Sequence, residues 1–137
     1  MITYDELDIQ VSASGDLTIA ANGDLAMAAA SGVLKQDITF RLKTDFNDFT
    51  PHPDIGADLS SLIGEQNTRA TAQRGEEKIV SCLTRDGRIA GTDLIVKGVP
   101  ISLYSQVYYV FVRDGISVLN VTPDMSFDLN QGILAYQ

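Results

Sequence analysis

The sequence has little of what catalytic and exported proteins commonly contain. Among its 137 residues there is one cysteine, Cys82, and one histidine, His52. A single cysteine cannot form an intramolecular disulfide, which argues against a small secreted domain. The first six residues, MITYDE, lack the basic and apolar regions of a signal peptide. No apolar run approaches the ~20 residues of a membrane span. We therefore expect a chain that assembles in a cytoplasm.

Basic residues are also few. Ten Lys and Arg stand against 18 Asp and Glu, and the formal net charge is -8. Nucleic-acid binding needs a basic patch, whereas the ten basic residues are scattered along the chain. The acidity has two interpretations, general solubility or a surface that meets basic partners. We expect neither nucleic acid nor a membrane as a partner.

No group of residues predicts catalysis, a cofactor or a metal. His52 lies between two prolines without a second histidine, and a metal site needs three or four ligands. Cys82 stands beside Leu83 on a predicted helix, as small core residues do. A glycosidase needs two carboxylates, one in an apolar setting that raises its pKa. The available pair is Asp58, which looks like a helix cap, and Glu65, which follows a glycine that ends a helix. We expect no enzyme.

The hydrophobic fraction of 45% suits one compact α+β domain over residues 1–137. Alternation of polar and apolar residues predicts a β-hairpin within 1–30, with strands at 8–11 and 16–20 followed by a turn at 22–24. The tripeptide Gly-Asp-Leu occurs at 15–17 and again at 23–25. We interpret it as two strand starts and not as a repeat architecture, which needs longer units and more copies.

Residues 31–84 form the predicted helical part, with two to three helices. Apolar spacing and end signals place them at 32–43, 59–63 and 68–84. Their expected N-caps are Ser31, Asp58 and Asn67. Gly75 inside the last helix costs about 1 kcal/mol relative to alanine. It marks either a close contact with another helix or a tolerated weakness.

The apolar period changes to two after residue 88 and predicts an antiparallel sheet over 88–122. Gly98-Val99-Pro100 interrupts the run, and a long strand is expected at 101–113. Asp114-Gly115 is a hairpin signal, and the returning strand follows it. Residues 123–137 are expected to form an extended C-terminal arm.

The segment GVLKQDITFRLKT at 32–44 resembles the helix that opens the short baseplate wedge proteins of contractile phage tails. In that family a Gln early in the helix precedes a Leu-x-Thr ending. A loop with a Pro-Asp pair, a Gly and a helix with paired leucines follow, here PDIGADLSSLIG at 53–64. Gly23-Asp24-Leu25 is similar to the family's start. The resemblance covers about 15–122. The family's Gly-Glu after the Thr and its Glu-Pro-Arg after the long helix differ here.

The resemblance implies a structural role in the virion. Such a protein would sit near the tail axis in the baseplate, join wedge to hub and start the sheath. The implied partners are the tail sheath protein, other baseplate wedge subunits, and hub or tube proteins, with six copies per particle. The sheet would resemble the inner domain of tail sheath proteins and offer strand edges to the arms of the first sheath ring. The family is sometimes labelled lysozyme-like.

An open strand edge can take up a strand from another chain, because its N–H and C=O groups are unpaired. We therefore predict that the 101–113 strand and the C-terminal arm contact the sheath or wedge. The predicted contact residues are Leu103, Tyr104, Val107, Tyr108, Tyr109, Arg113, Leu134 and Tyr136. Two alternatives stay open: the strand is an ordinary central strand, and the arm folds back on its own sheet.

The turn Asp86-Gly87-Arg88 is a further candidate, at the centre of the wedge. A guanidinium binds carboxylates bidentately, so Arg88 could pair with an acidic group in a helical bundle shared between subunits. The alternatives are a solvated arginine and, for Asp86, a standard Asp-Gly turn. Two other functions remain as competing hypotheses, a tail-associated lysozyme-like hydrolase using Asp58 and Glu65, and a tail-completion or neck adaptor.

Overall fold

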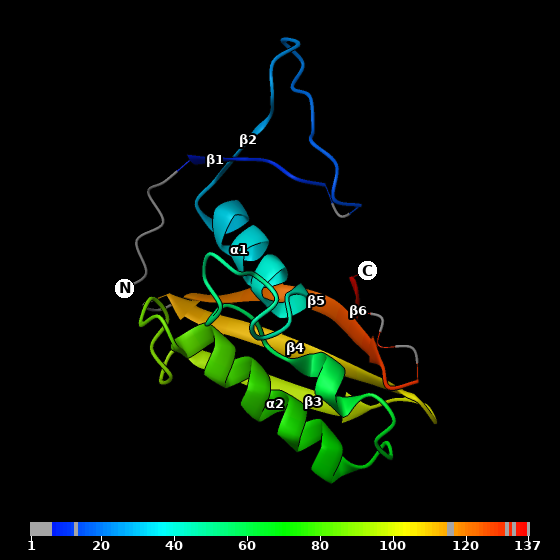
Figure 1. Cartoon of the computed structure of the whole chain (residues 1–137). Helices are drawn as coiled ribbons and strands as arrows, with labels where there is room; N and C mark the ends of the chain where they lie inside the picture. Colours follow the sequence, from blue (N-terminus) through cyan, green and yellow to red (C-terminus); the bar gives the residue numbers. More distant parts are fainter. Residues whose placement is uncertain (1–6, 13, 115–116, 131, 133, 137) are drawn as a thin grey trace.

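The fold is mixed α+β, as predicted. The computed structural model describes residues 7–12, 14–114, 117–130, 132 and 134–136. It consists of a helix–sheet body, made by the described residues from 31 onward, and an N-terminal β element that stands away from it (Figure 1). The start of the predicted hairpin at 1–6 and Gly115 of the predicted turn lie outside the described residues.

Four antiparallel strands form the sheet of the body, in the order β3-β4-β5-β6. Their bounds are β3 Leu94–Pro100, β4 Ser105–Asp114, β5 Ser117–Asp128 and β6 Leu134–Tyr136. The predicted strand at 101–113 is therefore wrong at its start. Residues 101–104 are a turn, in which the N–H groups of Ile101 and Ser102 both donate to the Ser105 carbonyl. The predicted arm is also wrong over 123–128, which belong to β5.

The predicted helices are confirmed, with small changes at their ends. They are α1 Ser31–Lys43, the 3-10 helix η1 Leu59–Leu62, and α2 Arg69–Thr84. Of the three predicted caps, Ser31 and Asn67 are wrong, whereas Asp58 does hold the N-cap position of η1. The cap of α1 is Ala30, and the side chain of Asp58 makes no cap hydrogen bond. The cap of α2 is Thr68, whose side chain accepts from the Thr71 N–H.

Both helices cover the same face of the sheet, α1 against β5 and α2 against β3 (Figure 1). The core lies between these layers, because alternate residues of β4 point into it. Its fully buried members include Ile38, Leu62, Ile79, Leu83, Ile89, Tyr108, Val110, Val112, Phe127 and Leu129. Gly75 of α2 is buried over β4, where a Cβ would overlap the ring and hydroxyl of Tyr108. Its close contact is thus with a strand and not with another helix.

Residues 7–29 form a three-armed β element, which we call the star. β1 Leu7–Ile9 pairs with β2 Met27–Ala29, Val11 pairs with Leu17, and Ile19 pairs with Leu25. The three arms meet at a closed ring of backbone hydrogen bonds. The Gln10 N–H donates to Ala26 O (2.9 Å), the Ala26 N–H to Thr18 O (2.8 Å), and the Thr18 N–H to Gln10 O (3.3 Å).

The star is built from a repeat of eight residues. Octads begin at 7, 15 and 23, and the ring residues 10, 18 and 26 hold the same position in each. Each octad has Asp at its second position and a large aliphatic residue at its third. Leu17 and Leu25 do begin paired segments after turns, as predicted, but the exclusion of a repeat was wrong. Three short units suffice here, because the ring gives each strand two partners.

Candidate interaction surfaces

The sheet face opposite the helices carries a row of apolar side chains. In β4 these are Val107, Tyr109 and Phe111, all half-buried. In β3, Ile95 pairs with Phe111 and Val99 with Val107, so all four lie on this face. Ile95 and Val99 are 39% and 45% exposed. No helix in the described part of the chain covers this face, so it is available to a partner.

The 101–104 turn extends this apolar surface beyond the end of β3. Ile101, Leu103 and Tyr104 are all more than half exposed. Leu103 and Tyr104 therefore stand where the sequence prediction needs them, accessible to another molecule, although in a turn and not in a strand. Their contact with a partner stays a prediction.

A chain of amides holds this turn in place. The Asn67 side-chain NH₂ donates to Ser102 O (2.6 Å) and Ser105 O (3.0 Å). Asn67 Oδ1 accepts from Gln106 Nε2 (2.8 Å), and Gln106 Oε1 accepts from the Tyr108 hydroxyl. Burial raises the pKa of Tyr108 well above its usual range, and the nearby Glu76 charge raises it further. The hydroxyl therefore stays a donor, and the turn is tied to the core.

The backbone of β4 offers no free edge, because β3 and β5 flank it. The predicted docking edge at 101–113 is therefore wrong, and the central-strand alternative holds. Tyr108 is fully buried, so it is not a contact residue. Val107 and Tyr109 remain accessible only through the apolar face. Arg113, at the far end of β4, is exposed, and its N–H donates to Asp93 O.

The two edges of the sheet differ in how open they are, and the edge opposite β3 is formed partly by β6 and partly by β5. On β3, the Gly98 N–H already donates to Glu76 Oε1 (2.7 Å), and Pro100 has no N–H to offer. On β5, β6 pairs only with Met125, Ser126 and Phe127. Within the described residues, no strand pairs with 117–124 on the side away from β4. This stretch of β5 is the more accessible edge.

The C-terminal arm folds back on its own sheet, which was one of the two predicted alternatives. Leu134 pairs with Phe127 and Tyr136 with Met125 in the β5–β6 ladder. The backbone of these residues is therefore already used within the chain. Ile133 of the same apolar run lies outside the described residues.

Asp86 forms its ion pairs inside the chain. The Arg41 Nη2 of α1 lies 2.6 Å from Asp86 Oδ2, and Arg41 Nε lies 3.1 Å from Asp37. Burial raises the pKa of Asp86, but hydrogen bonds from the Arg41 side chain and the Arg88 N–H lower it, and the net shift is downward. The Arg88 side chain is 61% exposed and only 3.6 Å from Asp86. The turn thus fastens α2 to α1, and Arg88 fits the solvated alternative.

The two carboxylates of the hydrolase hypothesis are both paired with cations. Arg74 Nη2 lies 2.6 Å from Glu65 Oε2, and its hydrogen bond and charge lower the pKa of Glu65. A general acid needs the opposite shift. Lys78 Nζ lies 3.1 Å from Asp58 Oδ2. This pair does not have the environment of a glycosidase site.

The remaining reactive side chains form no site. Cys82 is buried, and burial raises the pKa of its thiol, so it is not an activated nucleophile. Exposed His52 stacks on Phe49 at a centroid distance of 6.0 Å. The described residues include no cluster of three or more His, Cys, Asp or Glu that could hold a metal. In that same part of the chain, no helix is long and apolar enough to cross a membrane.

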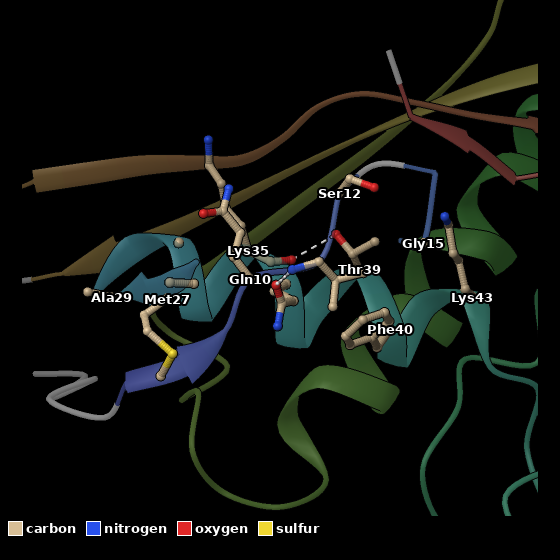
Figure 2. Close-up of a pocket in the computed structure, with 13 residues that line it drawn as sticks. Gln10, Ser12, Gly15, Met27, Ala29, Lys35, Thr39, Phe40 and Lys43 are labelled. Carbon is tan, nitrogen blue, oxygen red and sulfur yellow. Dashed lines mark hydrogen bonds between the residues drawn. The ribbon is translucent and has the colours of Figure 1, made fainter. Parts of the chain in front are cut away.

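The star presents a second apolar surface, which the sequence prediction missed. Its aliphatic residues are largely exposed: Leu7, Ile9, Leu17, Ile19, Leu25 and Met27. Gln36 of α1 holds its base, accepting from the Val11 N–H (2.9 Å) and donating to Ile9 O (2.9 Å). A groove of about 460 Å³ lies between the star and α1, with Met27 and Phe40 among its lining residues (Figure 2).

Comparison with known proteins adds no relative. No family model matches the chain, and neither a curated protein nor a solved structure matches it significantly. The signal that could have revealed the star was the recurrence of Asp followed by a large aliphatic residue every eight positions, at 8–9, 16–17 and 24–25.

Proposed function

We propose that this chain is a structural subunit of a contractile phage tail baseplate, which joins wedge to hub and starts the first sheath ring. The observation that carries the proposal is a two-layer domain in which, among the described residues, no helix covers the apolar sheet face and no strand pairs with 117–124 on the side away from β4. A domain that folds alone normally covers such a face or keeps it polar. A subunit of a permanent assembly leaves it for its neighbours.

The sequence resemblance names the assembly. The glutamine on which it partly rests, Gln36, connects α1 to the star in this structure. The pairing of Glu65 with Arg74 removes the nearest candidate for a general acid, which favours the structural role over the hydrolase. In this proposal the sheet corresponds to the inner domain of a sheath subunit.

Strand pairing with the sheath would use the edge of β5 and not that of β4. An incoming sheath arm would extend the sheet beside 117–124, next to the end of β6. Backbone hydrogen bonds would supply affinity there, while the apolar face would contact wedge or hub subunits. Leu103 and Tyr104 would contribute to this second contact, because they are exposed and lie in the turn that follows β3.

Two neighbouring proline variants, Val118→Pro and Leu119→Pro, test the strand contact. Of two consecutive residues in β5, one N–H points to β4 and the next points to the open side. One proline therefore removes a ladder hydrogen bond and lowers the melting temperature, and the other removes only an edge donor. We expect the edge variant to fold normally and to lose binding to purified sheath protein in calorimetric titrations.

Normal sheath binding by both folded variants would exclude this edge as the docking strand. The assignment to the baseplate itself is tested by a reconstruction of the tail. A position at the neck, or peptidoglycan-cleaving activity that disappears in a Glu65→Gln variant, would overturn the proposal.

A further inference from the structure

The three arms of the star present equivalent side chains. The third octad position holds Ile9, Leu17 and Leu25, and the fifth holds Val11, Ile19 and Met27. Each third-position residue pairs with a fifth-position residue of another octad. Directly opposed residues, and residues two apart on one strand, lie on one face of a β structure. The six aliphatic side chains therefore share one face with an approximate three-fold axis.

These aliphatic side chains form an exposed cluster and are not single apolar residues scattered over the surface. Leu17 and Ile19 are 60% and 71% exposed, and Ile9, Leu25 and Met27 are between 40% and 50% exposed. The arm with the turn at 20–24 projects away from the body (Figure 1). The ring of backbone hydrogen bonds keeps the star ordered without help from its aliphatic side chains. An exposed apolar face of this kind is typical of a surface that binds another molecule.

The charge of the star restricts what that partner can be. Each octad carries one aspartate, Asp8, Asp16 and Asp24, and residues 7–34 include no Lys or Arg. Each aspartate directly precedes a third-position aliphatic residue, so it points to the opposite face of the star. A second copy would bring together two chains that each carry a net charge of -8, and an anionic lipid surface would be repelled by the same net charge. The complementary surface is therefore apolar and carries no net negative charge.

The symmetry of the star restricts the partner further. Three equivalent patches around an axis are matched in full by a surface that repeats three times around the same axis. We propose that the star docks on the end of a homotrimeric protein, one copy of this chain per trimer, so that each arm meets one subunit. The trimers to test are the trimeric hub, spike and fibre proteins of the same tail. This choice rests on the proposed function.

The experiment mixes the full-length chain with each purified trimer and measures stoichiometry by native mass spectrometry and affinity by calorimetry. We expect one chain per trimer. Ile9→Gln, Leu17→Gln and Leu25→Gln hold the same octad position, so each should weaken binding by a similar factor, about tenfold. A matched control, Ile63→Gln, changes an aliphatic residue outside the star whose exposure, 45%, is close to that of Ile9 and Leu25, and it should leave trimer binding unchanged.

The possible outcomes separate this inference from the proposed function. Three chains per trimer, unequal losses among the three variants, or a dimer of this chain that the Leu17→Gln variant dissolves would each overturn it. Sheath binding without any trimer binding would overturn the inference and leave the proposed function standing. Trimer binding without sheath binding would support the inference and remove the sheath contact. Binding to neither would overturn both.

Discussion

The body and the star are both held by backbone hydrogen bonds, but the body buries its apolar side chains and the star exposes them. In the body, alternate residues of β4 are fully buried beneath the two helices, and Ile38 and Ile79 have no exposed surface. In the star, a closed ring of three hydrogen bonds orders the chain, while six of its aliphatic side chains are between 40% and 71% exposed. The body therefore derives its stability from burial, and the star derives its order from turns and repeated backbone pairing.

The largest expected difference between the two regions concerns isoleucine. Ile79→Ala in α2 should lower the free energy of unfolding by about 3 kcal/mol, because it leaves a cavity in the core. Ile19→Ala in the star should change it by less than about 0.5 kcal/mol, because that side chain is exposed. Urea denaturation of both variants measures this. Equal losses would mean that the star is part of the core and that the distinction is false.

A smaller effect is expected from glycine in the body. Gly75→Ala places a methyl group against the ring of Tyr108 and should cost about 2 kcal/mol through overpacking. The matched control is Gly91→Ala, where a Cβ meets nothing within 4 Å and φ is not positive. Thermal melts of the two proteins should separate clearly. If Gly75→Ala melts like the control, the contact between α2 and β4 is looser than described.

The smallest effect concerns an ion pair that has no counterpart in the star. Asp86→Asn should cost about 1 kcal/mol at pH 7, because it weakens the pairing with half-buried Arg41. The pKa of Asp86 is lowered in the folded protein, so its contribution is present above the unfolded pKa and is lost as pH falls through the folded pKa. The difference from the unsubstituted protein should therefore shrink in acid.

Chemical denaturation between pH 7 and pH 2 measures the difference in the free energy of unfolding between the Asp86→Asn variant and the unsubstituted protein. The control is Asp16→Asn in the star, whose carboxylate accepts from the exposed Ser14 hydroxyl and should matter by less than about 0.5 kcal/mol. A difference for Asp86→Asn that stays constant down to pH 2 would show that its carboxylate charge contributes nothing.

Local patterns were enough to predict the helices, and they failed where pairing depends on distant residues. Leu34, Ile38 and Leu42 form a stripe on one face of α1, and all three are buried. Pro100 was taken as an interruption, but an outer strand tolerates a proline, and β3 is an outer strand. The strand order that makes β4 central follows from the return of β5 and β6, which no local pattern encodes.

The same difference between local pattern and distant pairing explains the outcome for the candidate contact residues. Leu103 and Tyr104 are exposed, but in a turn and not on the strand edge where they were predicted, and their contact with a partner stays a prediction. Tyr108 was identified as accessible although it is buried, because the face to which a strand residue points depends on which elements pack above it. The star was missed because its ring joins residues eight and sixteen positions apart, and each octad alone looks like an ordinary strand start.

The hydrogen bond from the Gly98 amide to Glu76 makes the two edges of the sheet unequal in their capacity to add a strand. With that amide occupied and no amide at Pro100, a foreign strand cannot run along the whole of β3. Two copies meeting in a crowded cell would therefore not extend one another into a filament from this side. Among the described residues, the backbone left for further strands lies on the opposite side, along 117–124 of β5 and the outer edge of β6, so added strands would lengthen the sheet in one direction.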